Sequence, residues 1–565
     1  MRLLSLAVLA CIAAFAAAAA APYHLRLSLG PNQDKDIVFG WTVDGVTDVA
    51  TYGPYVQYRP VGAPTWTYST ANCVSKRYTE EQTHFYCTVT NFAPNLDIEY
   101  LVGGKPSRSL SGLRNFRSAP VPGSSVKMAV MGDLGYEIGG PTGASLAAHA
   151  LKKDYSLVVH VGDIAYADTY DKKGPNLDYE LWNDRFMGLV EPTTSRVPYM
   201  LCPGNHDVTC HFDGDHDCAP NLTNFSYYRN RWHMPSAATD GPSDTGLWYT
   251  YTHGDIQFVS INTESDYPNS PFNKDTPTSA GGFAAPMPQM EWLAAKLAQF
   301  NTPEARALRP WVIVVGHRPV YSTLTLDYPP NFIETVRVTF EQLFAEHNVD
   351  LYISGHAHYY ERTLPINNFA HDENYDNVNK PVYIINGAAG NEEGHCTDVT
   401  PELPSYMPYR NYRQYGFGVI TTSKPTEGEA HTALLRRAAR ASANRGDVAR
   451  VASFVPTSKQ ADRASGDAKN TRLTRLSSLA RGAGNAGDVS PKSAWYGALP
   501  SQSEFTLSEA ELAAAARRAD AAAEAAANAD LGARADKRAL CYEFRATTVD
   551  QGPLMEAVDS FCIQH

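Results

Sequence analysis

The sequence predicts two folded regions of different class, an all-β sandwich followed by an α/β domain with two β-sheets flanked by helices. Short strands separated by turn residues fill residues 22–120, a pattern typical of a sandwich. Between residues 125 and 422, apolar strands alternate with helical segments such as 288–300 and 331–347. The length of 565 residues also exceeds what one compact core usually accommodates. We therefore expect at least two domains.

The N-terminal region contains five apolar segments that we expect to form strands. They cover residues 25–29, 37–41, 55–58, 85–89 and 98–102. Turn residues separate the segments, as in antiparallel sandwiches. We expect Cys73 and Cys87 to form a local disulfide in this region. A module of this kind normally serves as a docking surface and carries no chemistry.

Five short motifs of the second region each follow an apolar run that predicts a buried strand. The motifs are Gly-Asp133-Leu-Gly, Gly-Asp163-Ile-Ala-Tyr166, Gly-Asn205-His206-Asp207, Val-Val-Gly-His317 and Gly-His356-Ala-His358, and the runs are 126–131, 157–161, 198–201, 311–315 and 350–353. The carboxyl ends of strands in an open α/β sheet meet at one edge, where ligand sites are normally built. We therefore expect the polar residues of the motifs to gather at one shared edge.

The motifs supply seven candidate metal ligands. These are Asp133, Asp163, Tyr166, Asn205, His317, His356 and His358. Carboxylate, phenolate, carboxamide and imidazole groups suit iron, zinc and manganese, and one carboxylate can bridge two ions. A single Gly-Asp motif is more often a turn, but five such motifs in this order are not expected by chance. The set predicts a two-metal site.

These motifs resemble those of the purple acid phosphatase family, within the calcineurin-like metallophosphoesterases. The generic superfamily begins with Asp-x-His, whereas Gly135 stands at that histidine position and Tyr166 takes its place. The resemblance covers about residues 22–422 and resumes at 540–565. The Gly-His-Arg-Pro motif around His317 and the cysteine-containing loop after His206 resemble fungal and protist members of the family more than plant members. The resemblance implies a fibronectin type III-like N-terminal domain and a four-layer α/β catalytic sandwich of two mixed sheets flanked by helices.

The resemblance also implies roles for the candidate ligands. A ferric site would use Asp133, Tyr166 and His358, Asp163 would bridge, and a divalent site for zinc, iron or manganese would use Asn205, His317 and His356. The implied reaction is hydrolysis of phosphate monoesters by a metal-bound hydroxide. His206 would stabilise or protonate the leaving group, with a turn-capping role as the alternative. Asp207 is a candidate for orienting His206.

One departure from the plant members concerns substrate contacts. Plant members carry a histidine pair shortly after the fourth motif, whereas residues 323–330 contain no histidine. Arg318, Tyr321 and Tyr359 are candidate replacements, with structural packing as the alternative for each.

The net charge and the N-terminal residues limit which binding partners and which cellular compartment we expect for this protein. The net charge is -12, which argues against nucleic acid or an anionic membrane as the main partner. The family resemblance implies a small-molecule phosphate ester as the substrate. Residues 1–21 predict a signal peptide, with an uncleaved anchor as the alternative. No later segment is apolar enough to span a bilayer. We expect entry into the secretory pathway, with a secreted, vacuolar or lysosomal destination; no particular oligomeric state is predicted.

Cysteines and glycosylation motifs agree with export. Cys11 belongs to the predicted signal peptide, and the other eight cysteines can form up to four disulfides. Pairing among the cysteines between residues 202 and 396 stays open at this point. Asn221 and Asn224 each begin a glycosylation motif, and crowding argues against occupancy of both.

Residues 424–538 interrupt the α/β pattern. They are rich in Ala, Arg, Ser and Gly and cannot bury a large core, so we expect a disordered insertion. One helix is predicted within it, at residues 509–529. An artefact of gene prediction is the alternative explanation. Strands at 540–565 would then complete the catalytic domain.

Three functions remain after these arguments. The leading one is an acid phosphatase acting on phosphate monoesters. Hydrolysis of phosphodiesters or nucleotide pyrophosphates at the same site is an alternative, because pocket shape decides between them. The third is a non-catalytic binding protein stabilised by metal, which the complete ligand set and His206 argue against.

Overall fold

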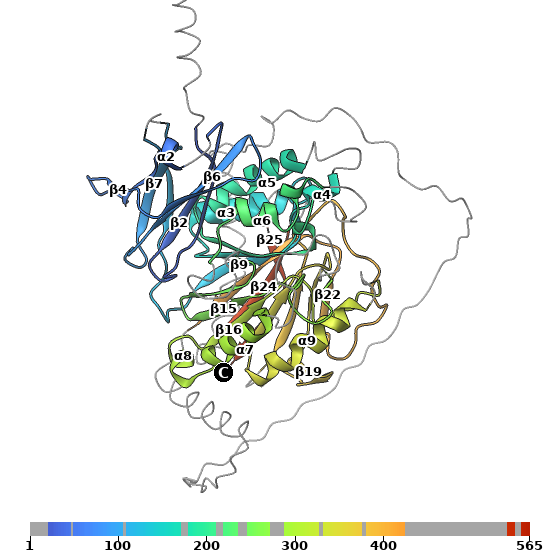
Figure 1. The fold of residues 1–565 in the computed structure, drawn as a ribbon. Helices are drawn as coiled ribbons and strands as arrows, with labels where there is room; N and C mark the ends of the chain where they lie inside the picture. Colours follow the sequence, from blue (N-terminus) through green and yellow to red (C-terminus); the bar gives the residue numbers. More distant parts are fainter. Residues whose placement is uncertain are drawn as a thin grey trace, which may run out of the picture. The chain divides into compact units, whose positions relative to one another are not determined.

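The computed structural model describes eleven segments of the chain. They are residues 21–46, 49–105, 109–170, 179–210, 218–235, 246–271, 288–326, 331–375, 380–423, 539–547 and 555–564. All of them belong to one compact unit (Figure 1). The predicted insertion at 424–538, its helix at 509–529 and the predicted signal peptide up to residue 20 lie outside the described residues.

The N-terminal region forms two antiparallel four-stranded sheets, with strand orders β1-β2-β6-β5 and β4-β3-β7-β8. The elements are β1 (Tyr23–Leu29), β2 (Ile37–Asp44), α2 (Val49–Tyr52), β3 (Pro54–Pro60), β4 (Thr67–Ser69), β5 (Cys73–Lys76), β6 (Gln82–Val89), β7 (Asp97–Gly104) and β8 (Arg114–Arg117). The five predicted strands correspond to β1, β2, β3, β6 and β7. The short strands β4, β5 and β8 escaped prediction because most of their residues are polar or exposed.

Aromatic side chains fill the space between these two sheets. Phe39 packs edge-on against Tyr100 and Phe116, with ring centroids 4.9 and 5.6 Å apart. Trp41 stacks on Phe85, and all five rings are buried. Such rings contribute a large share of the apolar area that stabilises a small sandwich.

The second region contains two larger mixed sheets. The six-stranded sheet has the order β13-β11-β9-β23-β24-β25, and the seven-stranded sheet has the order β14-β15-β16-β17-β21-β18-β22. In the first sheet β9, β11 and β13 are parallel, and in the second β15, β16, β17 and β21 are parallel. The strands of the first sheet are β9 (Lys127–Met131), β11 (Val158–Val161), β13 (Tyr199–Cys202), β23 (Gly416–Thr422), β24 (Ala539–Thr547) and β25 (Met555–Gln564). Those of the second are β14 (Tyr249–His253), β15 (Ile256–Ser260), β16 (Trp311–Val315), β17 (Leu351–Ser354), β18 (Tyr360–Arg362), β21 (Val382–Asn386) and β22 (Tyr409–Asn411).

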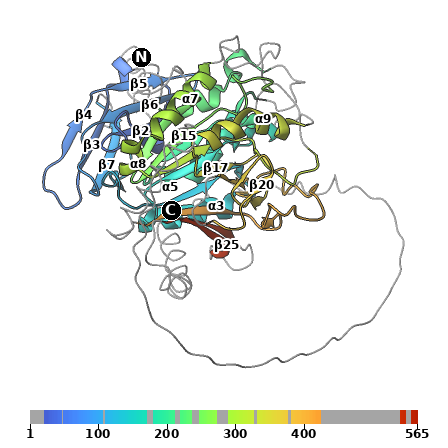
Figure 2. The same cartoon turned by 90° about the horizontal axis from the view of Figure 1, so that it is seen from below.

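Helices accompany both sheets. They are α3 (Gly140–Lys152), α4 (Ala167–Tyr170), α5 (Tyr179–Thr194), α6 (Ser226–Arg231), α7 (Pro288–Phe300), α8 (Pro303–Leu308) and α9 (Phe332–Glu346). α3 packs on α5 and contacts β24 of the first sheet, whereas α7 contacts β15 of the second (Figures 1 and 2). The helices predicted at 288–300 and 331–347 are α7 and α9. None of the helices that the structure describes is long and apolar enough to cross a membrane.

Strands β24 and β25 complete the six-stranded sheet beside β23, although they lie more than 100 residues after β23 in the sequence. Gly418 pairs with Phe544 and Thr422 with Leu540 across the β23–β24 ladder. Asn386 of the other sheet donates its side-chain N–H groups to the Val130 carbonyl (2.9 Å) and the Tyr542 hydroxyl (2.7 Å). This amide therefore ties the two sheets together.

Three disulfides occur among the described residues. Cys73 pairs with Cys87, as expected, and the other pairs are Cys210–Cys218 and Cys541–Cys562. Cys202 and Cys396 are free thiols, so the eight cysteines do not reach the maximum of four bonds.

A buried histidine makes the stability of this fold depend on pH. His253 is buried in β14, where its Nε2 lies 2.8 Å from the Ser156 hydroxyl. Burial, reinforced by Arg309, lowers the pKa of His253 to about 3 from 6.5. The imidazole of His253 therefore binds a proton more weakly in the folded state than in the unfolded state. Its stabilising contribution is complete above pH 6.5 and is lost as the pH falls toward the folded-state value.

We expect His253 to lower the free energy of unfolding by on the order of 2 kcal/mol between pH 7 and pH 5. A His253→Gln variant should lose less stability over this interval than the wild type. Urea denaturation at the two pH values measures the difference, with His371→Gln, at a half-buried position, as the control. Equal losses for wild type, variant and control would contradict the expectation.

Candidate metal centre

The predicted site residues lie at the carboxyl ends of parallel strands from both large sheets. Asp133 follows β9, Asp163 follows β11, and the 3-10 turn η1 (Asn205–Asp207) follows β13. His317 follows β16, and the His356–His358 segment follows β17. The expectation of one sheet edge was wrong in this respect. Two sheet edges face each other and supply the residues jointly.

The backbone of the site is strained at several ligand positions. Positive φ angles occur at Asp133 (62°), Asp163 (54°), Ala165 (77°), Tyr166 (54°) and His356 (69°). Non-glycine residues adopt this region rarely and at a cost of about 1–3 kcal/mol, so it persists only where the surroundings enforce it. Clustering of such residues is typical of functional sites.

Two glycines let the ligand-bearing turns approach each other. A Cβ atom added at Gly204 would lie 2.2 Å from Asp163 Oδ1, and one added at Gly355 would lie 2.1 Å from Asp133 Oδ2. No real Cβ atom tolerates such distances. Glycine is therefore required in these motifs by the close packing of backbone on carboxylate.

One group of candidate ligands surrounds the hydroxyl of Tyr166. This oxygen lies 2.9 Å from Asp133 Oδ1, 2.9 Å from His358 Nε2 and 3.2 Å from Asp163 Oδ2. His358 Nδ1 lies 2.9 Å from the carbonyl oxygen of Gly394, which directs Nε2 toward the tyrosine. Burial, together with Asp133 and Asp163, raises the pKa of Tyr166 well above 10.

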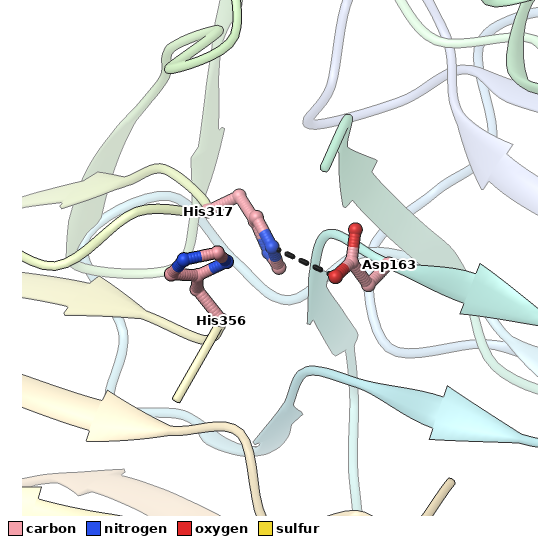
Figure 3. A group of neighbouring side chains, drawn as sticks. All are labelled: Asp163, His317 and His356. Atoms are coloured by element: carbon pink, nitrogen blue, oxygen red, sulfur yellow. Dashed lines mark ion pairs between the residues drawn. The ribbon is translucent and has the colours of Figure 1, made fainter. Parts of the chain in front are cut away.

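A second group surrounds the side-chain oxygen of Asn205. His317 Nε2 lies 3.0 Å and His356 Nδ1 2.9 Å from Asn205 Oδ1. His317 Nε2 also forms a 2.9 Å ion pair with Asp163 Oδ2 (Figure 3). Ligand atoms of Asp163, His317 and His356 all lie within 4.8 Å of one another. Asp163 Oδ2 therefore belongs to both groups.

The donor set fits two cations. Three oxygens and an imidazole nitrogen of the first group are hard or borderline donors, and the second group offers a carboxamide oxygen and two imidazoles. A cation beside Tyr166 would favour the tyrosinate, which burial and two carboxylates otherwise oppose. The carboxylate of Asp163 is placed to serve both positions.

His206 lies beside these groups and is held by a carboxylate. Its Nδ1 is 2.8 Å from Asp168 Oδ2, its Nε2 is 3.9 Å from Asp163 Oδ2, and its ring packs on Tyr166 with centroids 4.3 Å apart. Burial opposes the charged imidazolium, but Asp168 and Asp163 raise the pKa of His206 well above 6.5. The Nε2–H of a charged His206 is thus directed at the site.

Comparisons with known proteins place this geometry in a family. Residues 126–360 match the calcineurin-like phosphoesterase family, and residues 380–427 match the C-terminal region described as iron/zinc purple acid phosphatase-like. The C-terminal match and the relatives described below show that this chain is similar to the purple acid phosphatases. The family resemblance found in the motifs is therefore confirmed.

Several acid phosphatases are similar to this chain over part of their length. Acid phosphatase type 7 from Danio rerio is 34% identical over 307 residues, 51% of this chain and 60% of that protein. An acid phosphatase from Aspergillus ficuum is 30% identical, covering 49% of this chain and 53% of that protein. The Fe(3+)-Zn(2+) purple acid phosphatase 12 from Arabidopsis thaliana is 27% identical over 72% of this chain and 79% of that protein. The chain thus spans 60% or less of the length of the animal and fungal relatives.

A solved structure shows the same fold. The purple acid phosphatase PPD1 from yellow lupin seeds superimposes with a TM-score of 0.55 at 21% sequence identity, covering 71% of this chain and 70% of that chain.

Three side chains predicted to contact substrate lie in different surroundings. Arg318 is buried, pairs with Glu264 and contacts His356. The Tyr321 hydroxyl donates to Glu341 at the edge of a separate hollow of about 410 Å3. The Tyr359 side chain is buried, with its hydroxyl 2.6 Å from Ser322 Oγ. Of the three, Arg318 is the one bonded to a candidate ligand.

Sequence reasoning missed two carboxylates near His206. Asp168 is only two residues beyond Tyr166, so its closeness in sequence to a ligand was an available signal. Glu393 Oε1 lies 3.7 Å from His206 Nε2, and this glutamate follows β21, far from the motifs, with no signal of its own. Asp207, a predicted candidate for orienting His206, contacts the backbone of the ligand-bearing turns. It accepts hydrogen bonds from the backbone N–H groups of Gly204, Asp163 and Ile164.

The two glycosylation motifs differ in exposure. Asn221 is exposed, with its side-chain nitrogen 2.6 Å from the Tyr78 carbonyl oxygen. Asn224 is half-buried and its φ angle is 63°. Of the two, Asn221 has the more accessible side chain.

A methyl group at Gly204 should damage the site. Gly204→Ala must displace Asp163, whose backbone nitrogen would also lie 2.4 Å from the new Cβ atom. We expect the free energy of unfolding to fall by about 1–3 kcal/mol and bound metal per chain to decrease. Thermal unfolding and metal analysis measure both effects. Gly188→Ala, where no atom lies within 4 Å of the new carbon, is the matched control, and equal metal content in the two variants would refute the expectation.

Proposed function

We propose that this protein is an acid phosphatase that hydrolyses phosphate monoesters at a binuclear metal centre. The observation that carries the proposal is the position of Asp163. One of its oxygens lies 3.2 Å from the Tyr166 hydroxyl and 2.9 Å from His317 Nε2, so a single carboxylate joins two groups of metal donors. The names of the animal, fungal and plant relatives agree with this activity. No described contact favours the diesterase or the non-catalytic alternative.

The two ions would differ in kind. Asp133, Tyr166 and His358 offer the harder donors and would hold Fe(III), with Asp163 bridging. A divalent ion would use the carboxamide and imidazoles of the second group. The name of the Arabidopsis relative supports zinc there, with iron or manganese as alternatives. When bound, such a pair of cations polarises the phosphoryl oxygens and lowers the pKa of the attacking water.

His206 would act as the general acid for the departing alcohol. Its Nε2 faces the site, and Asp168 accepts a hydrogen bond from Nδ1 and thereby fixes the ring orientation. The raised pKa of His206 keeps it protonated at acidic pH. Both side chains are buried, which excludes bulk water from the proton to be transferred.

The proposal also includes the domain boundaries, the export of the protein and its glycosylation. We infer a fibronectin type III-like domain at 22–120, a four-layer catalytic sandwich at 125–422 completed by 540–565, and an insertion at 424–538. Export through the secretory pathway after removal of residues 1–21 is supported by three disulfides, which are typical of oxidising compartments. Asn221 is the preferred glycosylation site because it is the more exposed of the two asparagines.

The visible spectrum tests the identity of the first ion. Charge transfer from tyrosinate to Fe(III) should give the purified protein a purple absorption band. Tyr166→Phe should abolish the band, whereas Tyr199→Phe, which removes another buried hydroxyl of the same domain, should retain it. A phosphatase-active, metal-loaded sample without a band would show that another ion occupies this site.

Kinetics of an Asp168→Asn variant test the role of His206. Loss of the carboxylate removes a group that raises the pKa of His206, so the alkaline limb of the activity profile should shift to lower pH. We also expect kcat to fall by about 10- to 100-fold with little change in KM. Asp154→Asn is the matched control because Asp154 pairs with His149 (2.7 Å) elsewhere in the domain. An unchanged pH profile would remove His206 from the proposed mechanism.

A further inference from the structure

The carbonyl end of helix α6 is bonded by side chains of the N-terminal region. The ammonium group of Lys76, in β5, donates to the carbonyl oxygens of Arg229 (2.6 Å) and Trp232 (3.0 Å). The hydroxyl of Tyr86, in β6, donates to the carbonyl oxygen of Asn230 (2.7 Å). The last carbonyl groups of a helix have no partner within the helix, and a lysine is a suitable donor for them. The N-terminal region therefore supplies hydrogen bonds that complete this end of α6.

The side chains that hold α6 are themselves fixed. Arg26 donates to the Tyr86 hydroxyl (2.7 Å), and its guanidinium lies 5.0 Å from the centroid of the Tyr86 ring. This buried ring stacks on His233, just beyond α6, with centroids 4.9 Å apart. The Ser28 hydroxyl donates to the carbonyl oxygen of His233 (2.8 Å). Buried polar networks restrict the positions of their members, so this contact is more constrained than a loose docking surface.

Helix α6 in turn holds the chain on both sides of the turn η1. The Tyr228 hydroxyl donates to the carbonyl oxygen of Leu201 (2.9 Å), which lies in β13 shortly before the turn. The backbone N–H of Phe225, the residue before α6, donates to the carbonyl oxygen of Val208 (2.9 Å), the residue after the turn. The helix and its first flanking residue are therefore bonded to the chain before and after η1.

The strand that leads into η1 has less support within its sheet than the neighbouring strands that carry candidate ligands. β13 is an edge strand of the six-stranded sheet, whereas β9 and β11 have a strand on each side. Residues at the end of α6 and beyond it contact β13 instead. The Trp232 ring stacks on Tyr199, with centroids 5.5 Å apart, and the backbone N–H of Leu201 donates to Met234 Sδ (3.4 Å). The position of η1 depends on α6 for this reason.

We propose that Lys76 and Tyr86 position His206 through α6, so that the N-terminal region takes part in placing the general acid. The inference rests on the proposed function, in which His206, in the middle of η1, protonates the departing alcohol. No described contact joins Lys76 or Tyr86 to a candidate ligand, so both are positioning residues. A catalytic group displaced by about 1 Å can lower the rate by about 100-fold, even when the mutation is remote.

Two substrates with different leaving groups test the inference on the full-length, metal-loaded protein. The alcohol of glycerol 2-phosphate must be protonated as it departs, whereas 4-nitrophenolate leaves as a stable anion. Lys76→Met removes the ammonium group and keeps an unbranched side chain. We expect kcat for glycerol 2-phosphate to fall by about tenfold, kcat for 4-nitrophenyl phosphate to fall by less than about twofold, and both KM values to stay within about twofold. A purely structural role would lower both rates alike.

A second variant and a control accompany Lys76→Met, with the melting temperature as the measure of folding. Tyr86→Phe removes the hydroxyl that contacts Asn230 and keeps the ring on His233. It should shift the ratio of the two rates in the same direction, and it decides the question if Lys76→Met does not fold. Asp34→Ala removes another contact of the N-terminal region, to Arg309 (2.7 Å), and should leave both rates as in the wild type.

The ratio of the two rates separates the possible outcomes. An unchanged ratio in the folded Lys76 and Tyr86 variants, or an equal shift in the Asp34 control, would overturn the inference alone. A wild-type protein that is loaded with iron and zinc and hydrolyses neither ester would overturn both the inference and the proposed function.

Discussion

The candidate site depends on how one buried carboxylate, that of Asp163, is held. The backbone nitrogen of Asp163 donates a hydrogen bond to the Asp207 carboxylate, and the backbone nitrogen of His206 donates one to Asp163 Oδ1. Asp163 Oδ2 contacts both groups of donors. Gly204 permits this packing because no side chain intervenes. Asp207 and His206 follow β13, whereas His317 follows β16, so a shift of either strand would change the distance between the two groups.

Charge balance explains why so many acids are tolerated here. Asp133, Asp163, Asp168 and Asp207 are all buried within a few ångströms of the cluster, and an uncompensated buried carboxylate is costly. Backbone N–H groups compensate Asp207, and His206 compensates Asp168. Asp133 accepts from the backbone nitrogen of His356, so it also links the two sheets. The remaining negative charge is what two cations would neutralise.

The ligands were predictable because the signal is local, a buried strand followed by glycine and a donor. The same logic located β9, β11, β13, β16 and β17 to within about two residues. Two sheets were predicted, but the assignment of each of these strands to one or the other sheet was not, because strand order is a long-range property. The surroundings of Arg318 and Tyr321 were equally hidden. Their partners Glu264 and Glu341 are distant in sequence and were not distinguishable from ordinary surface acids.

The pairing of β23 with β24 has a consequence for the covalent integrity of the protein. Ser423 and Ala539 are 116 positions apart, yet they meet at the end of one antiparallel ladder. Within the described residues, the disulfide of the C-terminal strands joins β24 to β25 and none crosses to the rest of the domain. A single peptide-bond cleavage between these positions therefore yields two polypeptides joined by sheet hydrogen bonds and packing. Such a nicked protein would migrate as one species in native gels and as two under denaturing conditions without reductant.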